Sequence, residues 1–179
     1  MPINSQAKGK RAELAVANWF KVNGFPDACR AVKTGTAHTH DAGDLILEHG
    51  QFRLCVEVKH RAGGLSDSEV MQFGTKLQQQ IVMSKSHFGI LVERRDRVGD
   101  PGRWWVHVHG TAFALLVIRQ VALGAVADFQ PVRVQLGYLA ELLREAGLAS
   151  TLTPVASSAP SVTRRTGTEA ERPQAVGGT

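Results

Sequence analysis

The chain has 179 residues, of which 43% are hydrophobic, and it carries a formal net charge of +5. This length suits one domain with a substantial core and is too short for two domains of ordinary size. The basic balance favours a polyanionic partner such as nucleic acid, although charge alone does not identify one. The hydrophobic runs are far shorter than the roughly 20 residues of a membrane-spanning helix. The N-terminal stretch has no signal-peptide core, so we expect a cytoplasmic protein without membrane contact.

The first predicted element is a helix in SQAKGKRAELAVANWFKVNGF, which stops near Gly24. Val16, Ala17 and Phe20 fall on one helical face, and Glu13 lies three, four and seven residues before them. An acid in register with a buried stripe is unusual on a surface helix. The alternative interpretation is that Glu13 only stabilises the N-terminal part of the helix through the helix dipole.

Three strand-like runs come next, and the last two flank the short turn EHGQ, which predicts a hairpin. The three runs cover residues 28–34, 44–48 and 52–59. A second helix begins near Leu65, where Ser66 and Glu69 have the spacing of a capping box. Its predicted apolar face consists of Val70, Phe73, Leu77 and Ile81.

Two further strands are predicted at 88–95 and 103–110, followed by helices in TAFALLVIRQVAL and GYLAELLREAGL. The order of elements predicts an α/β fold with a central mixed β-sheet flanked by helices. We expect a core at 1–110, a helical extension packed on it at 111–149, and a disordered tail at 150–179, where Ser, Thr, Pro, Ala and Gly dominate. Cys29 and Cys55 sit in apolar runs and are expected to be buried free thiols.

The predicted hairpin carries a chemically informative set of charges. Glu57 and Lys59 are two residues apart in a strand, so their side chains share one face. Asp44 opens the neighbouring strand, where its carboxylate can approach that of Glu57. Two converging carboxylates repel unless a cation lies between them, and Mg²⁺ suits such oxygen ligands.

Water bound to Mg²⁺ has a lowered pKa and can attack a phosphodiester. In this hypothesis Lys59 assists that water or the phosphate, and Glu13 completes the acidic cluster. The sequence therefore predicts a metal-dependent hydrolytic site built from Glu13, Asp44, Glu57 and Lys59.

The segments GKRAELAVANWFKVNGF, GDLIL and FRLCVEVKH resemble the PD-(D/E)xK nuclease superfamily, and within it most closely the archaeal-type Holliday-junction resolvases. The resemblance covers about residues 8–109. It implies a restriction-endonuclease-like fold, Mg²⁺ dependence with Mn²⁺ able to substitute, a homodimer, and nicking of a four-way DNA junction. By this analogy Glu13, Asp44, Glu57 and Lys59 take the catalytic positions. Gly43 departs from the pattern, because the family often has proline there.

Other interpretations stay open on the sequence alone. The same chemistry fits a restriction-like or repair nuclease acting on other DNA structures, and the same basic surface fits a DNA-binding relative that does not cut. His38 and His40 have a ligand spacing but no third partner in view, so we treat them as loop residues. Asp41 competes with Asp44 if the strand begins earlier. Either Gln79 or Gln80 is a candidate to assist the site.

Cations flank the predicted site in the sequence, and phosphate contacts provide much of the affinity of proteins for DNA. The predicted DNA-binding residues are Lys8, Lys10, Arg11, Arg30, Lys33, Thr36 and Arg61.

Overall fold

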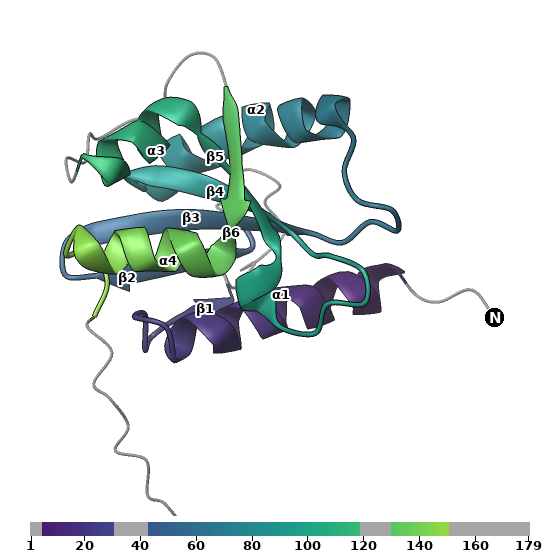
Figure 1. Ribbon diagram of the computed structural model, residues 1–179, viewed down its shortest axis with the longest axis horizontal. Helices are drawn as coiled ribbons and strands as arrows, with labels where there is room; N and C mark the ends of the chain where they lie inside the picture. The colour runs from purple at the N-terminus through teal and green to yellow at the C-terminus, as the bar shows by residue number, and fades with distance from the viewer. Residues whose placement is uncertain (1–4, 31–42, 119–129, 151–179) are drawn as a thin grey trace, which may run out of the picture.

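The computed structural model describes residues 5–30, 43–118 and 130–150. Within these ranges one six-stranded sheet runs in the order β1-β2-β3-β4-β5-β6, with helices on both of its sides (Figure 1). The strands are β1 Cys29–Arg30, β2 Leu45–His49, β3 Phe52–Lys59, β4 Phe88–Glu93, β5 Trp105–His109 and β6 Pro131–Gln135. The helices are α1 Ser5–Lys21, α2 Asp67–Ser84, α3 Gly110–Val117 and α4 Leu136–Glu145, with a short 3-10 turn, η1, at Pro101–Arg103. The predicted mixed α/β sheet flanked by helices is confirmed.

Strands β3 and β4 are the parallel pair, and the remaining neighbours in the sheet are antiparallel. A parallel pair needs a crossover connection, which helix α2 supplies. Its capping box is formed as predicted, because the Ser66 side chain accepts from the Glu69 amide and the Glu69 side chain accepts from the Ser66 amide. The predicted hairpin is also present, with Gly50 at φ 57° in the turn between β2 and β3.

Two buried clusters fill the spaces on either side of the sheet. The larger one joins α1, the sheet, α3 and α4, and includes Phe20, Leu54, Leu116 and Leu139. The smaller one lies under α2 and contains Cys55, Val70, Leu77, Ile81 and Leu91. The helical faces expected from the spacing in α1 and α2 are therefore the faces that pack on the sheet.

The segment at 111–149 differs from its prediction as a helical extension, because Pro131–Gln135 forms strand β6 and pairs with β5 along its length. The run PVRVQ alternates, but it is only 5 residues long and its two valines are only partly buried, so its strand signal is weak. Leu136, Leu139 and Leu143 of α4 share one buried cluster with α1 and β3, so residues on both sides of position 110 form a common core. The tail predicted at 150–179 lies outside the described residues except for Ser150.

The prediction that both cysteines are buried is wrong for Cys29, which is exposed, while Cys55 is buried. Cys29 lies on the edge strand β1 and lines an open pocket together with Asp27, Ile46 and Arg53. An edge strand has a neighbour on one side only, and this explains why an apolar sequence context did not bury the thiol here.

Candidate active site

Asp44 and Glu57 lie beside each other at one end of the sheet. The β2–β3 register pairs Leu45 with Val56, so the preceding residue, Asp44, falls opposite Glu57. The Asp44 amide donates to the Val56 carbonyl at 2.9 Å, and Asp44 Oδ2 accepts from the Val58 amide at 2.8 Å. The backbone of β3 therefore holds Asp44 on both its main chain and its side chain. Asp44 lies opposite Glu57, as the predicted hairpin requires.

Gly43 explains how Asp44 can approach β3 so closely. Its φ of +95° is a conformation that glycine adopts without strain. A Cβ at this position would lie 2.8 Å from Cys55 Sγ and 3.1 Å from the Val56 carbonyl oxygen. Glycine at position 43 thus has a local physical reason, because the chain passes directly over β3 before it enters β2.

The Asp44 carboxyl group is perturbed by its surroundings, with a pKa raised from 3.8 to about 6. Burial is the main cause, and the negative charge of Glu57 is the second. The Val58 amide and the Lys59 ammonium oppose the rise, and Glu13 adds a small further increase. Two carboxylates thus share a poorly solvated corner in which a cation would relieve their repulsion.

Glu57 is only 2% exposed, and its carboxylate is surrounded by donors. Oε1 contacts the Lys59 ammonium and lies 3.6 Å from Lys76 Nζ, while Oε2 accepts from Gln80 Nε2 at 3.0 Å. A buried carboxylate is tolerated only when it is paired and hydrogen-bonded in this way. The structure therefore distinguishes the two candidate glutamines, because Gln80 is buried against Glu57 and Gln79 is exposed.

Lys76 is a site residue that the sequence reasoning missed. It lies four residues before Gln80, so both side chains fall on the same face of α2. The spacing of four residues in the sequence could have predicted this, because the helix face that presents Gln80 to Glu57 must also present Lys76 nearby. The second cation, Lys59, lies 5.0 Å from the centroid of the Phe73 ring, also on α2. Helix α2 thus contributes an amide, an ammonium group and an aromatic ring to the site.

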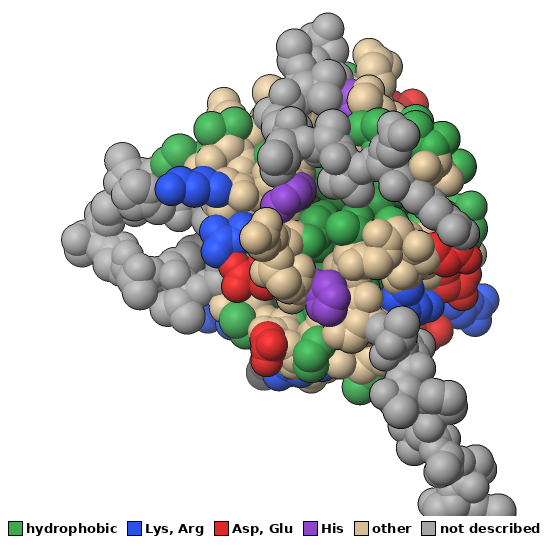
Figure 2. All heavy atoms as spheres, turned by 90° about the vertical axis from the view of Figure 1, so that its left-hand side faces the viewer, with side chains coloured by type: hydrophobic (Ala, Val, Ile, Leu, Met, Phe, Trp, Pro, Cys, Tyr) green, Lys and Arg blue, Asp and Glu red, His purple; other side chains and the backbone are tan. Residues whose placement is uncertain are grey.

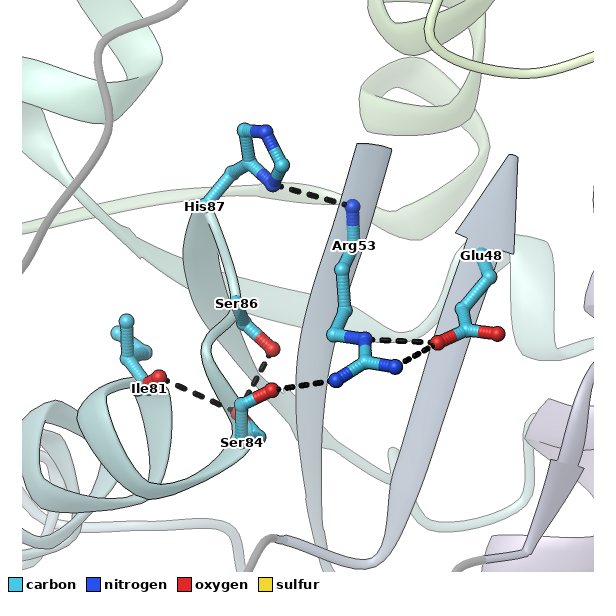
Figure 3. Close-up of polar contacts among 6 residues, drawn as sticks. All are labelled: Glu48, Arg53, Ile81, Ser84, Ser86 and His87. Atoms are coloured by element: carbon cyan, nitrogen blue, oxygen red, sulfur yellow. Dashed lines mark hydrogen bonds and ion pairs between the residues drawn. The ribbon is translucent and has the colours of Figure 1, made fainter. Parts of the chain in front are cut away.

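The C-terminal end of α2 is tied to the β2–β3 hairpin by Arg53 (Figure 3). Its guanidinium donates to the Ser84 carbonyl at 2.8 Å and to Glu48 Oε1 at 2.7 Å. The Arg53 amide donates to His87 Nδ1 at 3.2 Å, just after the helix has ended. These bonds fix α2 relative to β3, which is the relation that places Gln80 and Lys76 at Glu57.

Glu13 is engaged by Arg30 instead of pairing closely with the other two acids. Glu13 Oε2 lies 2.6 Å from Arg30 Nη2 and accepts from its Nε at 2.7 Å. Within residues 5–30, 43–118 and 130–150, no group of three His, Cys, Asp or Glu side chains is arranged to hold a metal ion. The predicted pair of Asp44 and Glu57 is brought together, whereas Glu13 reaches Asp44 only through its charge.

The remaining predicted DNA-binding residues fall into two groups. Lys8, Lys10, Arg11 and Arg61 are exposed, and Arg61 Nε lies 3.5 Å from Glu69 Oε1. Lys33 and Thr36 lie outside the described residues, as do the predicted loop residues His38 and His40 and the alternative acid Asp41. The N-terminal ends of α1 and α2 lie on the right-hand side of Figure 1. On the opposite side, Lys and Arg side chains are scattered among acidic, hydrophobic and uncharged ones (Figure 2).

Comparisons with known proteins give a distant likeness in structure. No family model and no curated protein matches the chain. Among solved structures it is similar to Hjc, a Holliday junction resolvase from the archaeal hyperthermophile Archaeoglobus fulgidus, with 18% identity and a TM-score of 0.41. The match covers 71% of this chain and 88% of that one. In the described part of the chain, no helix is long and apolar enough to cross a membrane.

Proposed function

We propose that the protein is a Mg²⁺-dependent, structure-selective DNA endonuclease, with Mn²⁺ able to replace Mg²⁺. The observation that carries this proposal is the pair of neighbouring carboxylates, Asp44 and Glu57, next to the Lys59 ammonium at one end of the sheet. Burial and the charge of Glu57 raise the pKa of Asp44 even though Lys59 lies nearby, so a further cation between the two acids would be favourable. Keeping the two acids together does not stabilise the fold, but it supplies two carboxylate ligands to a metal ion.

The donor set fits Mg²⁺ better than a transition metal. Mg²⁺ binds through one or two carboxylates, keeps several waters and takes substrate phosphate oxygens as further ligands. Asp44 and Glu57 would hold the ion, and when bound it would supply an activated water and neutralise charge on the phosphate. Glu13 remains a predicted third ligand, and to serve as one it must leave Arg30.

The side chains around Glu57 have definite tasks in this proposal. Gln80 holds Oε2 and thereby sets the plane of the carboxylate. Lys59 and Lys76 both approach Oε1, so binding of a cation at that oxygen competes with two ammonium groups. Once displaced from Oε1, an ammonium can bind a non-bridging oxygen of the scissile phosphate, where negative charge develops during hydrolysis. Lys76 suits this task because its side chain is 45% exposed.

The proposed substrate is a four-way DNA junction cut by a homodimer. Support for this finer assignment comes from the motifs GKRAE, GDLIL and LCVEVK and their resemblance to the archaeal-type resolvases. The exposed cations at the start of α1 and after β3 suit a DNA backbone passing the site. Other branched or duplex DNA substrates require the same chemistry, so substrate choice needs its own test.

The test uses purified protein with a labelled mobile junction, a flap and the matching linear duplexes, each with Mg²⁺ and with EDTA. We expect Mg²⁺-dependent cleavage of the junction ahead of the linear arms, and loss of cleavage in Glu57→Gln. Cleavage of duplexes at an equal rate would reject junction selectivity but retain the nuclease. DNA binding unaffected by EDTA, without cleavage in Mg²⁺ or Mn²⁺, would reject the nuclease.

A further inference from the structure

Arg133 belongs to a second group of cations, which the strand register places near the candidate site. The group lies on the same face of the sheet as the site and at the same end. Glu57 pairs with Leu91, Leu91 with His107, and His107 with Arg133. In the next row Lys59 pairs with Glu93, and Glu93 pairs with Trp105. Neighbouring strands are about 4.8 Å apart, so Trp105 lies about 10 Å from Lys59 and Arg133 about 14 Å from Glu57, measured along the sheet.

Two guanidinium groups gather over the Trp105 ring. The Arg95 guanidinium carbon lies 4.5 Å from the ring centroid, and that of Arg133 lies 5.2 Å from it. Arg95 also donates to the Arg103 carbonyl at 3.0 Å, which restrains its side chain. Cation–π contact and this hydrogen bond hold planar donors at the surface. We call Arg95, Trp105 and Arg133 the arginine–tryptophan platform.

The platform has little compensating negative charge. Neither Arg95 nor Arg133 forms an ion pair with an aspartate or glutamate among the residues that the structure describes. The nearby carboxylates have other partners. Asp96 accepts from the Gly63 amide at 3.1 Å, and the buried Glu93 bonds His107 at 2.8 Å.

Asp67 lines a pocket of about 210 Å³ together with Arg133 and His107. Because neither arginine is paired with a carboxylate in the described part of the chain, the platform presents positive charge, which favours binding of a polyanion.

We propose that Arg95 and Arg133, held over Trp105, bind phosphates of the DNA arm that leads away from the candidate cleavage site. The proposal rests on the proposed function, because it takes the scissile phosphate to lie at Asp44 and Glu57. A DNA strand advances 3.4 Å per nucleotide along the helix axis, so the platform falls about three to four nucleotides from the cut. Guanidinium groups suit phosphate because their planar donors can bind two of its oxygens at once.

The experiment measures DNA binding without catalysis. Fluorescence anisotropy of a labelled junction and a labelled duplex is recorded in EDTA from 50 to 200 mM salt, for wild type and for Arg95→Gln/Arg133→Gln. The single variants Arg95→Gln and Arg133→Gln are measured as well. Lys21→Gln is the matched control for each single variant, because it removes one charge from an exposed residue in the last turn of α1, away from the platform. Circular dichroism verifies that all variants are folded.

We expect the double variant to bind more weakly and to reduce the slope of log affinity against log salt by about 1.8, which is about 0.9 for each lost phosphate contact. Between 50 and 200 mM salt, wild type then loses about 12-fold more affinity than the double variant. Lys21→Gln should keep the wild-type slope. A double variant with wild-type slope and affinity would overturn the platform, even if the protein cleaves DNA.

Failure of the proposed function gives a different pattern. Binding with the reduced slope but no Mg²⁺-dependent cleavage would support the platform and reject the nuclease. Absence of DNA binding by wild type at the lowest salt would reject both. A reduction in slope in Lys21→Gln equal to that of either single arginine variant would also overturn the platform, because the effect would then reflect net charge alone.

Discussion

Replacing Asp44 with asparagine should stabilise the folded protein above about pH 6. The pKa of Asp44 is raised from 3.8 to about 6, so between these pH values the folded state binds a proton that the unfolded state has released. Stability from this group is complete below pH 3.8 and is lost as the pH rises through about 6. A shift of about two units corresponds to about 3 kcal/mol at neutral pH. Asparagine keeps an acceptor for the Val58 amide and removes the charge.

The measurement is urea denaturation of wild type and Asp44→Asn from pH 4 to 8. We expect the two unfolding free energies to converge near pH 4 and the variant to be more stable by up to about 3 kcal/mol at pH 8. Adding Mg²⁺ at about 100 times its dissociation constant should then stabilise wild type by about 2.7 kcal/mol, and the variant much less. A difference between the proteins that does not change with pH would refute the electrostatic reasoning.

Three further changes test the structure around the site. Gln80→Leu should destabilise the protein by about 1–3 kcal/mol in urea denaturation, because buried Glu57 loses a hydrogen bond. Gln79→Leu, at an exposed position, should change the unfolding free energy by less than about 0.5 kcal/mol. Equal effects of the two changes would contradict the assignment of Gln80. Gly43→Ala should lower the unfolding free energy by at least about 1 kcal/mol and abolish DNA cleavage, because the new Cβ would lie 2.8 Å from Cys55 Sγ. A fully active, stable variant would show that the position of Asp44 does not depend on the close approach of Gly43 to β3. Ser66→Ala should cost about 0.5–2 kcal/mol in thermal or urea unfolding through loss of the α2 cap. Gln72→Ala, at an exposed position of the same helix, is the control and should have little effect.

The sequence predicted most of the sheet because its central strands carry strong local signals. The run FRLCVEVK forms β3 over the residues expected, and the Gly50 turn sets the register that brings Asp44 to Glu57. Strand β6 was missed because PVRVQ is short and half-exposed, and it becomes a strand only because β5 offers an unpaired edge. Such pairing depends on tertiary contact, which no local pattern encodes.

The candidate site was predictable where it depends on strand periodicity and less so where it depends on side-chain reach. The shared face of Glu57 and Lys59 follows from a spacing of two residues. The ion pair between Glu13 and Arg30 depends on how α1 lies against β1, and it draws Glu13 toward a cation that was itself predicted to contact DNA. The choice between Gln79 and Gln80 likewise depends on the rotation of α2 about its axis, which its packing on β3 and β4 determines.

The most direct test of the proposed function is cleavage of a labelled four-way junction by pure wild type and by Glu57→Gln, with Mg²⁺ and with EDTA. We predict paired nicks near the junction for wild type in Mg²⁺, and no product in EDTA or with the variant. Equal cleavage by Glu57→Gln, or cleavage that persists in EDTA, would contradict a metal site built on Asp44 and Glu57.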